Sequence, residues 1–195
     1  ENYREAVNFV KNDQLSLGAL VTTHKLDLFK ACKDMFDVIG PHSTLMEETS
    51  CISKHHGNLI CNAKDPISSG LSLDGFLPKD HFANTGAELF SMGAGGSTIA
   101  LTWHIMQEIR GNNRPERIVV SDLSEPRLVH IRKIHKSLGS DIPIEYHLVE
   151  TSQDSDDILA SIAEGSVVIN ATGLGKDSPG SPLSDAANFP ENAII

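Results

Sequence analysis

The glycine-rich segment Gly93-Ala94-Gly95-Gly96-Ser97 contains the residue types that point most directly to chemistry. It follows the apolar run 89–92, which predicts a buried strand. Apolar residues then recur at helical spacing, at Ile99, Trp103 and Met106. Glycine has no Cβ, so its backbone can adopt positive φ and approach a ligand closely, and the amides that begin a helix attract phosphate. The segment therefore predicts a strand, a turn and a helix that bind a nucleotide pyrophosphate through residues 93–97.

An acidic residue ends the next predicted strand. Residues 117–122 are rich in β-branched side chains and end in Asp122. In a dinucleotide-binding βαβ unit, an acid at this point accepts hydrogen bonds from the adenosine ribose and repels a 2′-phosphate. Asp122 and the adjacent Leu123 are therefore predicted to contact the cofactor, with NAD favoured over NADP. Arg127 lies farther along and is a second candidate for a 2′-phosphate, so NADP stays possible. The alternative is an ordinary tight turn in which the acid caps the next helix.

Two charged residues in the first part of the chain are candidates for proton transfer. Lys25 follows the apolar segment 17–22, which predicts a strand, and it opens a predicted helix. Ligands of open α/β sheets gather at the carboxyl ends of strands, so Lys25 is a candidate for chemistry, the alternative being a solvated lysine. Asp74 is predicted to open a connecting helix that runs toward the glycine segment, or else to serve only as a cap or turn residue.

The spacing of apolar and turn-forming residues predicts the elements that position these side chains. Residues 50–53 and 58–61 flank a polar turn and predict a β-hairpin, and residues 65–72 form a loop rich in Pro, Ser and Gly. The remaining helices are expected near 1–10, 25–36, 124–138 and 156–164, and the remaining strands at 89–92, 117–122, 143–149 and 166–172. Such alternation of strands and helices is typical of a doubly wound parallel sheet.

We therefore expect an α/β protein of two domains. Residues 1–80 form an N-terminal α/β substrate and catalytic domain, and residues 81–195 form a Rossmann-type NAD(P)-binding domain with a doubly wound parallel sheet. The boundary falls in a polar stretch near residues 78–86. The first residues already predict a helix and residues 193–195 predict a strand, so the first domain is expected to be incomplete at its N-terminus and the second at its C-terminus.

Composition excludes several classes of partner. The chain has 195 residues, a net charge of −10 and no cluster of Lys and Arg, so nucleic acid is not an expected partner. Apolar runs are too short to span a membrane, and the start does not have the pattern of a signal peptide. Three cysteines without paired spacing favour a reducing cytoplasm. The only adjacent histidines, 55 and 56, lie in a polar turn without nearby acids, so no metal site is expected.

Four short motifs occur in a fixed order along the chain. They are Gly-Ala-Leu-Val-Thr-Thr-His-Lys at 18–25, Leu-Asp-Gly-Phe at 73–76, Gly-Ala-Gly-Gly at 93–96 and Val-Ile-Asn-Ala-Thr at 168–172. In this order and spacing they resemble shikimate dehydrogenases, including the quinate/shikimate dehydrogenase branch. The resemblance covers most of the chain.

The resemblance implies an NAD(P)-dependent oxidoreductase that transfers hydride between the nicotinamide and a secondary alcohol of a hydroxylated ring acid, such as shikimate/3-dehydroshikimate or quinate. It implies that Lys25 and Asp74 form the catalytic pair beside the substrate hydroxyl. It also implies that the small-molecule substrate is bound by Thr22, Lys25, Ser50 and Asp74, and that Asn170, Ala171, Thr172 and Gly173 meet the nicotinamide side of the cofactor. The N-terminal domains of such enzymes often pair, which makes a homodimer possible.

The chain also departs from the family pattern. Leu20 replaces an asparagine, and the motif before Lys25 is one residue shorter because it has no proline. Ser50-Cys51-Ile52 stands where the family has an Asn-Thr pair, and Ser72-Leu73-Asp74-Gly75 stands where it has Asn-Thr-Asp-Gly. Unpaired substrate hydroxyls would each cost about 1–3 kcal/mol, so the substrate can differ from shikimate.

Two alternative functions stay open at this point. A regulatory protein that kept the nucleotide domain but lost turnover would explain the altered substrate positions, although it would have no reason to keep both Lys25 and Asp74. An S-adenosylmethionine methyltransferase would show a similar glycine turn and strand-ending acid, but it has no evident use for the segment that ends in Lys25.

Overall fold

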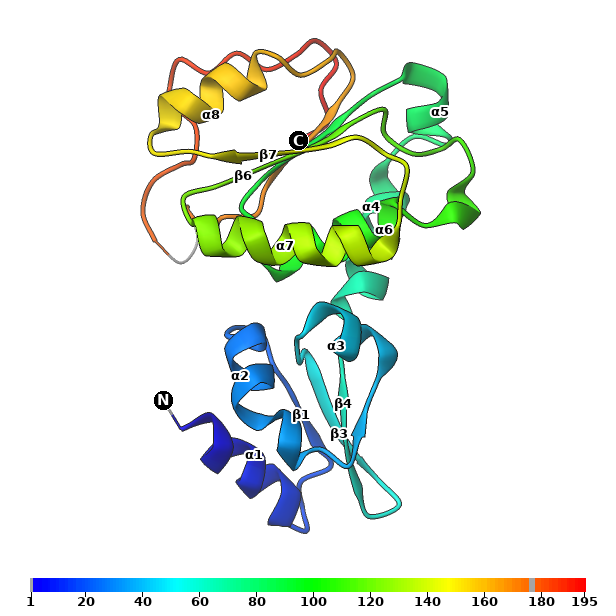
Figure 1. The fold of residues 1–195 in the computed structure, drawn as a ribbon, viewed down its shortest axis with the longest axis vertical. Coiled ribbons are helices and arrows are strands. Elements are labelled where there is room, and N and C mark those ends of the chain that lie inside the picture. The colour runs from blue at the N-terminus through cyan, green and yellow to red at the C-terminus, as the bar shows by residue number, and fades with distance from the viewer. Residues whose placement is uncertain (1, 176–177) are drawn as a thin grey trace. The chain divides into compact units, whose positions relative to one another are not determined.

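The computed structural model describes residues 2–175 and 178–195, and the chain divides into two compact units, residues 1–68 and 69–195. Figure 1 shows the elements of both units along the chain. The division falls inside helix α4 (Asp65–Phe76), earlier than the boundary predicted at residue 80. Asp74 therefore belongs to the second unit.

Unit 1 is an α/β unit built on a small mixed sheet. Its elements are α1 (Tyr3–Asn12), β1 (Gly18–Leu20), α2 (Lys25–Cys32), the 3₁₀ turn η1 (Lys33–Met35), β2 (Val38–Ile39), α3 (Pro41–Met46), β3 (Cys51–His55), β4 (Asn58–Asn62) and the start of α4. The strand order is β1-β3-β4-β2. β3 and β4 form the predicted hairpin, and β2, which the sequence pattern did not predict, pairs in parallel with β4.

The register of this sheet brings the carboxyl ends of two strands together. Leu20 of β1 pairs with Cys51 of β3, and Cys51 pairs with Asn62 of β4. Both pairings are antiparallel, so β1 and β4 run in the same direction and end at the same edge. The sheet is held by a core in which side chains of α1 and α2 pack on the strands: Val7, Leu28, Phe29, Cys32, Phe36, Ile52, Leu59 and Cys61.

The segment 65–72, predicted to be a loop, is the first part of helix α4. Asp65 and Pro66 begin the helix, as acids and prolines often do in a first turn. Gly70 is buried because the ring of His104 packs on it, and a Cβ at this position would lie 2.3 Å from that ring. Glycine is therefore needed in the helix for close packing, which outweighs its low helix propensity.

Unit 2 has the predicted Rossmann-type arrangement. Its elements after α4 are α5 (His81–Thr85), β5 (Leu89–Met92), α6 (Gly96–Ile105), the 3₁₀ turn η2 (Glu108–Arg110), β6 (Ile118–Asp122), α7 (Glu125–Leu138), β7 (Ile144–Leu148), α8 (Ser152–Leu159) and β8 (Val167–Asn170). The strands are parallel in the order β7-β6-β5-β8, which confirms the doubly wound sheet. Near the end of the chain, Ile194 forms an isolated parallel bridge with Val167.

Helices cover both faces of this sheet. Figure 1 shows α8 on one face and α6 with α7 on the other. Leu159 at the end of α8 packs with Phe90, Val119 and Val168 of the strands. Because both faces are covered, β5 and β6 are fully buried, which explains why most of their residues are apolar.

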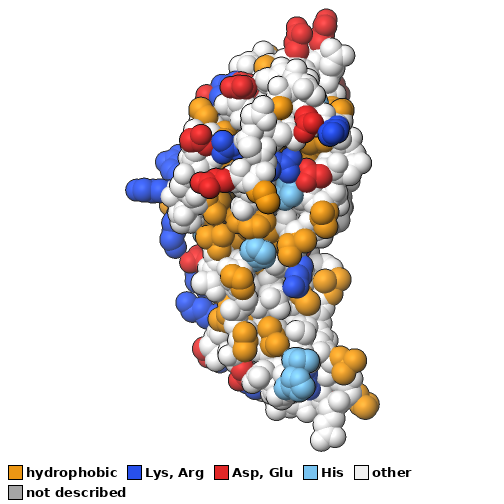
Figure 2. All heavy atoms as spheres, turned by 90° about the vertical axis from the view of Figure 1, so that its right-hand side faces the viewer, with side chains coloured by type: hydrophobic (Ala, Val, Ile, Leu, Met, Phe, Trp, Pro, Cys, Tyr) orange, Lys and Arg blue, Asp and Glu red, His pale blue; other side chains and the backbone are white. Residues whose placement is uncertain are grey.

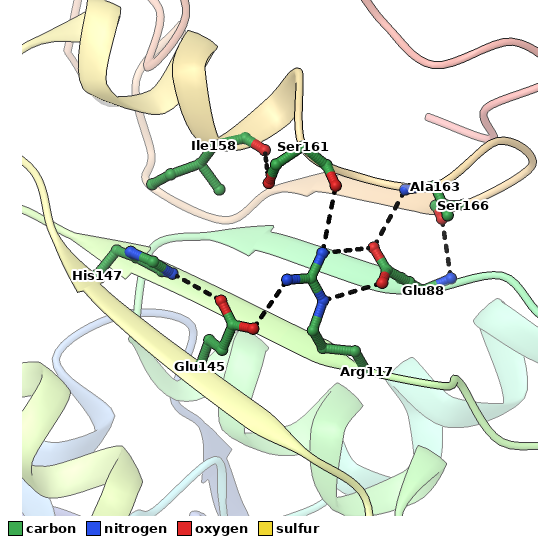
Figure 3. Close-up of polar contacts among 8 residues, drawn as sticks. All are labelled: Glu88, Arg117, Glu145, His147, Ile158, Ser161, Ala163 and Ser166. Atoms are coloured by element: carbon green, nitrogen blue, oxygen red, sulfur yellow. Dashed lines mark hydrogen bonds and ion pairs between the residues drawn. The ribbon is translucent and has the colours of Figure 1, made fainter.

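A charged cluster joins the strands at the edge of the sheet where they begin. Arg117 donates two hydrogen bonds of 2.9 Å to the carboxylate of Glu88 and one of 2.8 Å to Glu145, as Figure 3 shows. Glu88 also accepts the backbone N–H of Ala163, and Glu145 contacts His147. These carboxylates raise the pKa of Arg117, and Arg117 lowers the pKa of Glu145.

Replacing Arg117 with alanine is expected to lower the free energy of unfolding by about 2–3 kcal/mol, because it leaves the carboxylate of Glu88 largely buried with a single donor. Urea unfolding measures the change. Arg114→Ala is the matched control, since Arg114 pairs with Asp141, whose side chain is 80% exposed, and its loss should be much smaller. Equal losses for the two variants would contradict a structural role for the Arg117 cluster.

Surface charge does not form a broad basic area on the face in Figure 2. There the Lys and Arg side chains of unit 2 are interspersed with Asp and Glu side chains. Within residues 2–175 and 178–195, none of the helices has the length and apolar character needed to cross a membrane.

Candidate active site

The glycine turn after β5 is shaped by close backbone approach. Gly93 has a φ of +102°, and a Cβ there would lie 2.6 Å from the carbonyl oxygen of Ala171 after β8. Its N–H donates to the carbonyl oxygen of Ser121 at 2.7 Å, and its own carbonyl accepts a bond from the Thr98 hydroxyl. Only glycine fits this conformation and this contact without strain. The turn thus holds the carboxyl ends of β5, β6 and β8 together.

Helix α6 begins at this turn without a side-chain cap. Gly95 is its N-cap, in an extended conformation, and no side chain among the described residues accepts a hydrogen bond at this end. A Cβ on Gly95 would meet no atom within 4 Å. The amides of the first turn, from Gly96 and Ser97 onward, therefore lack an internal side-chain acceptor, which suits an anionic ligand.

Asp122 lies at the end of β6, as predicted, but its carboxylate already has backbone partners. One oxygen accepts the N–H of Ala94 at 2.6 Å, and the other accepts the N–H of Ser124 at 2.8 Å. Its side chain is nearly buried. A carboxylate has about four lone pairs, so two remain for ribose hydroxyls. Asp122 therefore both supports the glycine turn and is able to bind a nucleoside.

A cavity of about 360 Å³ opens at this edge of the sheet. Four of the predicted cofactor residues line it, namely Gly93, Asp122, Leu123 and Thr172. The cavity is also lined by residues that the sequence reasoning did not assign to the cofactor: Met92, Ser121, Ser124, Val149, Glu150, Thr151, Ser152, Ser155, Leu174, Ser181 and Pro182. Arg127, which sequence reasoning offered for a 2′-phosphate, also lines the cavity.

One pattern in the sequence could have predicted some of the cavity-lining residues that the sequence reasoning did not assign. Thr151 and Asp154 form a capping box at the start of α8, where each side chain accepts a backbone N–H of the other residue. The pattern of a threonine followed three residues later by an acid, directly after a strand, marks a helix that begins at the carboxyl edge of the sheet. Residues at such a helix start face the ligand site of an α/β sheet.

The predicted nicotinamide segment forms a compact turn after β8. The side-chain oxygen of Asn170 accepts the N–H of Thr172 at 3.1 Å and its hydroxyl at 2.7 Å. The backbone of Ala171 packs against Gly93, and Gly173 has a φ of +82°. Of these residues, Thr172 reaches the cavity, whereas Asn170 orients the turn.

In unit 1, Lys25 forms an ion pair with Asp65. Lys25 is the first residue of α2 after β1, and Asp65 is the first residue of α4 after β4, so both follow strands that end at the same edge of the sheet. The ammonium group of Lys25 donates to the Asp65 carboxylate, and the two side chains are 21% and 22% exposed. A partly exposed lysine–carboxylate pair is able to exchange a proton with a bound hydroxyl.

Asp74, the predicted catalytic partner of Lys25, belongs to unit 2, and its pairing with Lys25 stays a prediction. It lies in the last turn of α4 and does not open a helix. Its side chain accepts hydrogen bonds from His104 at 2.7 Å and from Arg110 at 3.1 Å. The sequence carried a signal for Asp65, since this acid follows the end of a strand and precedes a proline, as at many helix starts.

The other predicted substrate-binding residues of unit 1, Thr22 and Ser50, differ in their exposure to solvent and in the hydrogen bonds that they already make. Thr22 is exposed just after β1. Ser50 is buried, and its hydroxyl accepts the N–H of Lys64 at 2.6 Å. Ser50 therefore stabilises the turn that leads to Asp65, and a direct bond from its hydroxyl to substrate would compete with that role.

Two curated proteins that are similar to this chain in sequence are both shikimate dehydrogenases. The shikimate dehydrogenase (NADP(+)) of Streptococcus thermophilus is 24% identical over 161 residues, and that of Streptococcus pneumoniae is 24% identical over 163 residues. Each match covers 82% of this chain and 51% of the relative. The chain thus spans about half the length of the curated relatives it matches. No protein-family model matches the chain.

Solved structures share the fold. Quinate dehydrogenase from Corynebacterium glutamicum in complex with NAD superposes with a TM-score of 0.65 at 16% identity, covering 94% of this chain and 59% of that one. The 5-ketofructose reductase of a Gluconobacter species gives a TM-score of 0.61 at 18% identity, covering 91% and 57%. At such identities the structures establish the fold alone. The relatives found by sequence are thus shikimate dehydrogenases at 24% identity, and the solved structures show that the chain shares the fold of quinate dehydrogenase.

Proposed function

We propose that this chain is part of an NAD(P)-dependent oxidoreductase that interconverts a secondary alcohol and a ketone on a hydroxylated ring acid, such as quinate or shikimate. The observation that carries this proposal is the Lys25–Asp65 ion pair at the sheet edge of unit 1. It occurs in a chain whose second unit has a glycine turn and a cavity suited to a dinucleotide. The sequence relatives named shikimate dehydrogenase support the same class of reaction.

In this reaction, different residues of the chain would transfer the proton and bind the cofactor. A bound nicotinamide would supply the hydride acceptor for the carbinol carbon. Lys25 in its neutral amine form, held by Asp65, would take the proton from the substrate hydroxyl as the carbon–oxygen double bond forms, and the resulting ammonium group would return this proton in the reverse direction. Residues 93–97 and the start of α6 would hold the pyrophosphate. Asp122 and Thr172, which both line the cavity, would orient the ribose and nicotinamide portions.

We further propose NAD as the preferred cofactor, because the carboxylate of Asp122 lines the cavity and would repel a 2′-phosphate. Arg127 lines the same cavity and is the group that would bind NADP. The preference for NAD over NADP can therefore be tested by substituting Arg127, which leaves the hydrogen bonds of Asp122 to the glycine turn intact.

Calorimetric titration with NAD and NADP, followed by assays of reduced nicotinamide with quinate and shikimate, tests the proposal. We expect tighter binding of NAD and reduction with at least one ring acid. Arg127→Gln should leave NAD affinity unchanged and weaken NADP further. Tighter binding of NADP, lost in Arg127→Gln, would contradict the NAD preference. Binding of S-adenosylmethionine without binding of either dinucleotide would contradict the proposed function.

A further inference from the structure

Glu48 is a buried glutamate whose carboxyl group has no partner. Its exposed fraction is 0%, and within the described part of the chain neither carboxyl oxygen takes part in a hydrogen bond. An ionised carboxylate without donors is strongly disfavoured in a protein interior. A carboxyl group in this environment therefore holds a proton up to a higher pH than a solvated one. The roles described above for the glycine turn and for the Lys25–Asp65 pair do not require a buried glutamate at residue 48.

The backbone around Glu48 is tied to both elements that carry the ion pair. The N–H of Thr49 donates to the carbonyl oxygen of Lys25 at 3.2 Å. The N–H of Ser50 donates to the carbonyl oxygen of Asn62 at 3.0 Å, and the N–H of Lys64 donates to the Ser50 hydroxyl. Residues 48–50 thus connect the start of α2 with the turn that leads into α4. Glu48 is held beside the proposed proton-transfer pair.

The charged and titratable groups that act on Glu48 come from three elements. They are Lys25 of α2, Asp65 of α4 and the thiol of Cys61 on β4. Burial, and then the negative charge of Asp65, raise the pKa of Glu48 to about 7, while Lys25 lowers it. Burial is the main cause that raises the pKa of Cys61, so the thiol stays neutral near pH 7. Two carboxyl groups therefore share one ammonium group.

We propose that Glu48 is a positioning residue that sets the charge of Lys25 by gaining and losing a proton. While Glu48 is neutral, Lys25 faces one negative charge, that of Asp65. When Glu48 releases its proton to solvent, a second negative charge stabilises the ammonium form of Lys25. Ionised Glu48 thus favours ketone reduction, in which Lys25 gives a proton, and opposes alcohol oxidation, in which Lys25 accepts one. This inference rests on the proposed function of Lys25.

The first test needs no turnover. Lys25 is modified with trinitrobenzenesulfonate at about pH 8.5, where many lysines begin to lose their proton, and its rate is followed by peptide mass spectrometry. A nearby negative charge favours the ammonium form, which does not react, so Lys25 should react about tenfold faster in Glu48→Gln than in the wild type. Glu47→Gln, which changes the neighbouring exposed glutamate, should leave the rate unchanged. Equal rates in Glu48→Gln and the wild type would overturn the proposal.

A second measurement uses the unaltered protein. Carbon NMR of labelled glutamate carboxyl groups should show one group that titrates near 7, and this signal should be absent from Glu48→Gln. If every glutamate titrates in the ordinary range near 4, the proposal is wrong whatever the variants do.

Activity then separates this inference from the proposed function. With an accepted ring acid, the pH profile of kcat/KM should have an inflection near 7 that Glu48→Gln loses and Glu48→Asp keeps. A merely structural Glu48 would lower activity equally at every pH, and that outcome would overturn the proposal. If Lys25 reactivity changes as expected but no ring acid is oxidised, the proposed function fails while the control of Lys25 by Glu48 stands.

Discussion

Lys25→Met is expected to lower the rate of alcohol oxidation by about 10²–10⁴-fold, the usual contribution of a positioned proton-transfer group. Methionine keeps an unbranched side chain of similar reach but has no proton to exchange, and it leaves Asp65 without its cation. Nucleotide affinity should not change, because the glycine turn and the cavity are built from residues of unit 2. Steady-state kinetics with an accepted ring acid and calorimetric titration of the cofactor measure the two quantities separately.

Three further variants make this prediction specific. Lys30→Met removes an exposed lysine from the same helix, and it should leave kcat unchanged. Asp65→Asn should lower kcat strongly, since the neutral amide no longer holds the Lys25 side chain in place by an ion pair. Asp74→Asn should act on the contacts with His104 and Arg110 and leave proton transfer intact. Loss of activity in Asp74→Asn with normal activity in Asp65→Asn would restore the pairing expected from the sequence and refute the one proposed here.

Gly93→Ala is expected to lower the free energy of unfolding by about 3–5 kcal/mol and to abolish nucleotide binding. The residue has a φ of +102°, a conformation that L side chains rarely adopt, which costs about 1–3 kcal/mol. Its new Cβ would also lie 2.6 Å from the carbonyl oxygen of Ala171, and relief of such a clash costs a similar amount. Urea unfolding gives the stability change, and titration with NAD gives the change in affinity.

Gly95→Ala is the matched control within the same turn. Gly95 has a φ of −85°, and a Cβ there meets no atom within 4 Å, so stability should change by less than about 1 kcal/mol. Nucleotide affinity should still fall, because the methyl group would occupy space that a pyrophosphate needs beside the first amides of α6. If Gly95→Ala binds NAD as tightly as the wild type does, the pyrophosphate does not approach the turn in the proposed way.

The fold of unit 2 follows closely from the sequence. Strands β5, β6, β7 and β8 were each predicted from a short apolar run, and their parallel order from the alternation with helices. Such units are encoded locally, because each strand, turn and helix lies within about 30 residues. The need for glycine at residue 93 and for an acid at residue 122 arises from backbone geometry next to a strand end, which a sequence pattern records directly.

Sequence reasoning failed where the outcome depended on contacts between distant residues. The composition of residues 65–72 favours a loop, yet they are helical because Gly70 packs under the ring of His104. The expected loop also hid the helix start at Asp65, so the sequence reasoning did not consider this acid as a partner of Lys25.

The sequence by itself determined the strand, glycine turn and helix of unit 2 and the presence of a lysine just after a strand end. Only the tertiary structure decided which carboxylate pairs with Lys25 and that Glu48 is buried beside that pair without a partner. The physical reason is that pairing and burial depend on strand register and on the packing of α2, α3 and α4 around the sheet edge. The distances in space between Lys25, Asp65 and Glu48 cannot be read from the spacing of these residues along the chain.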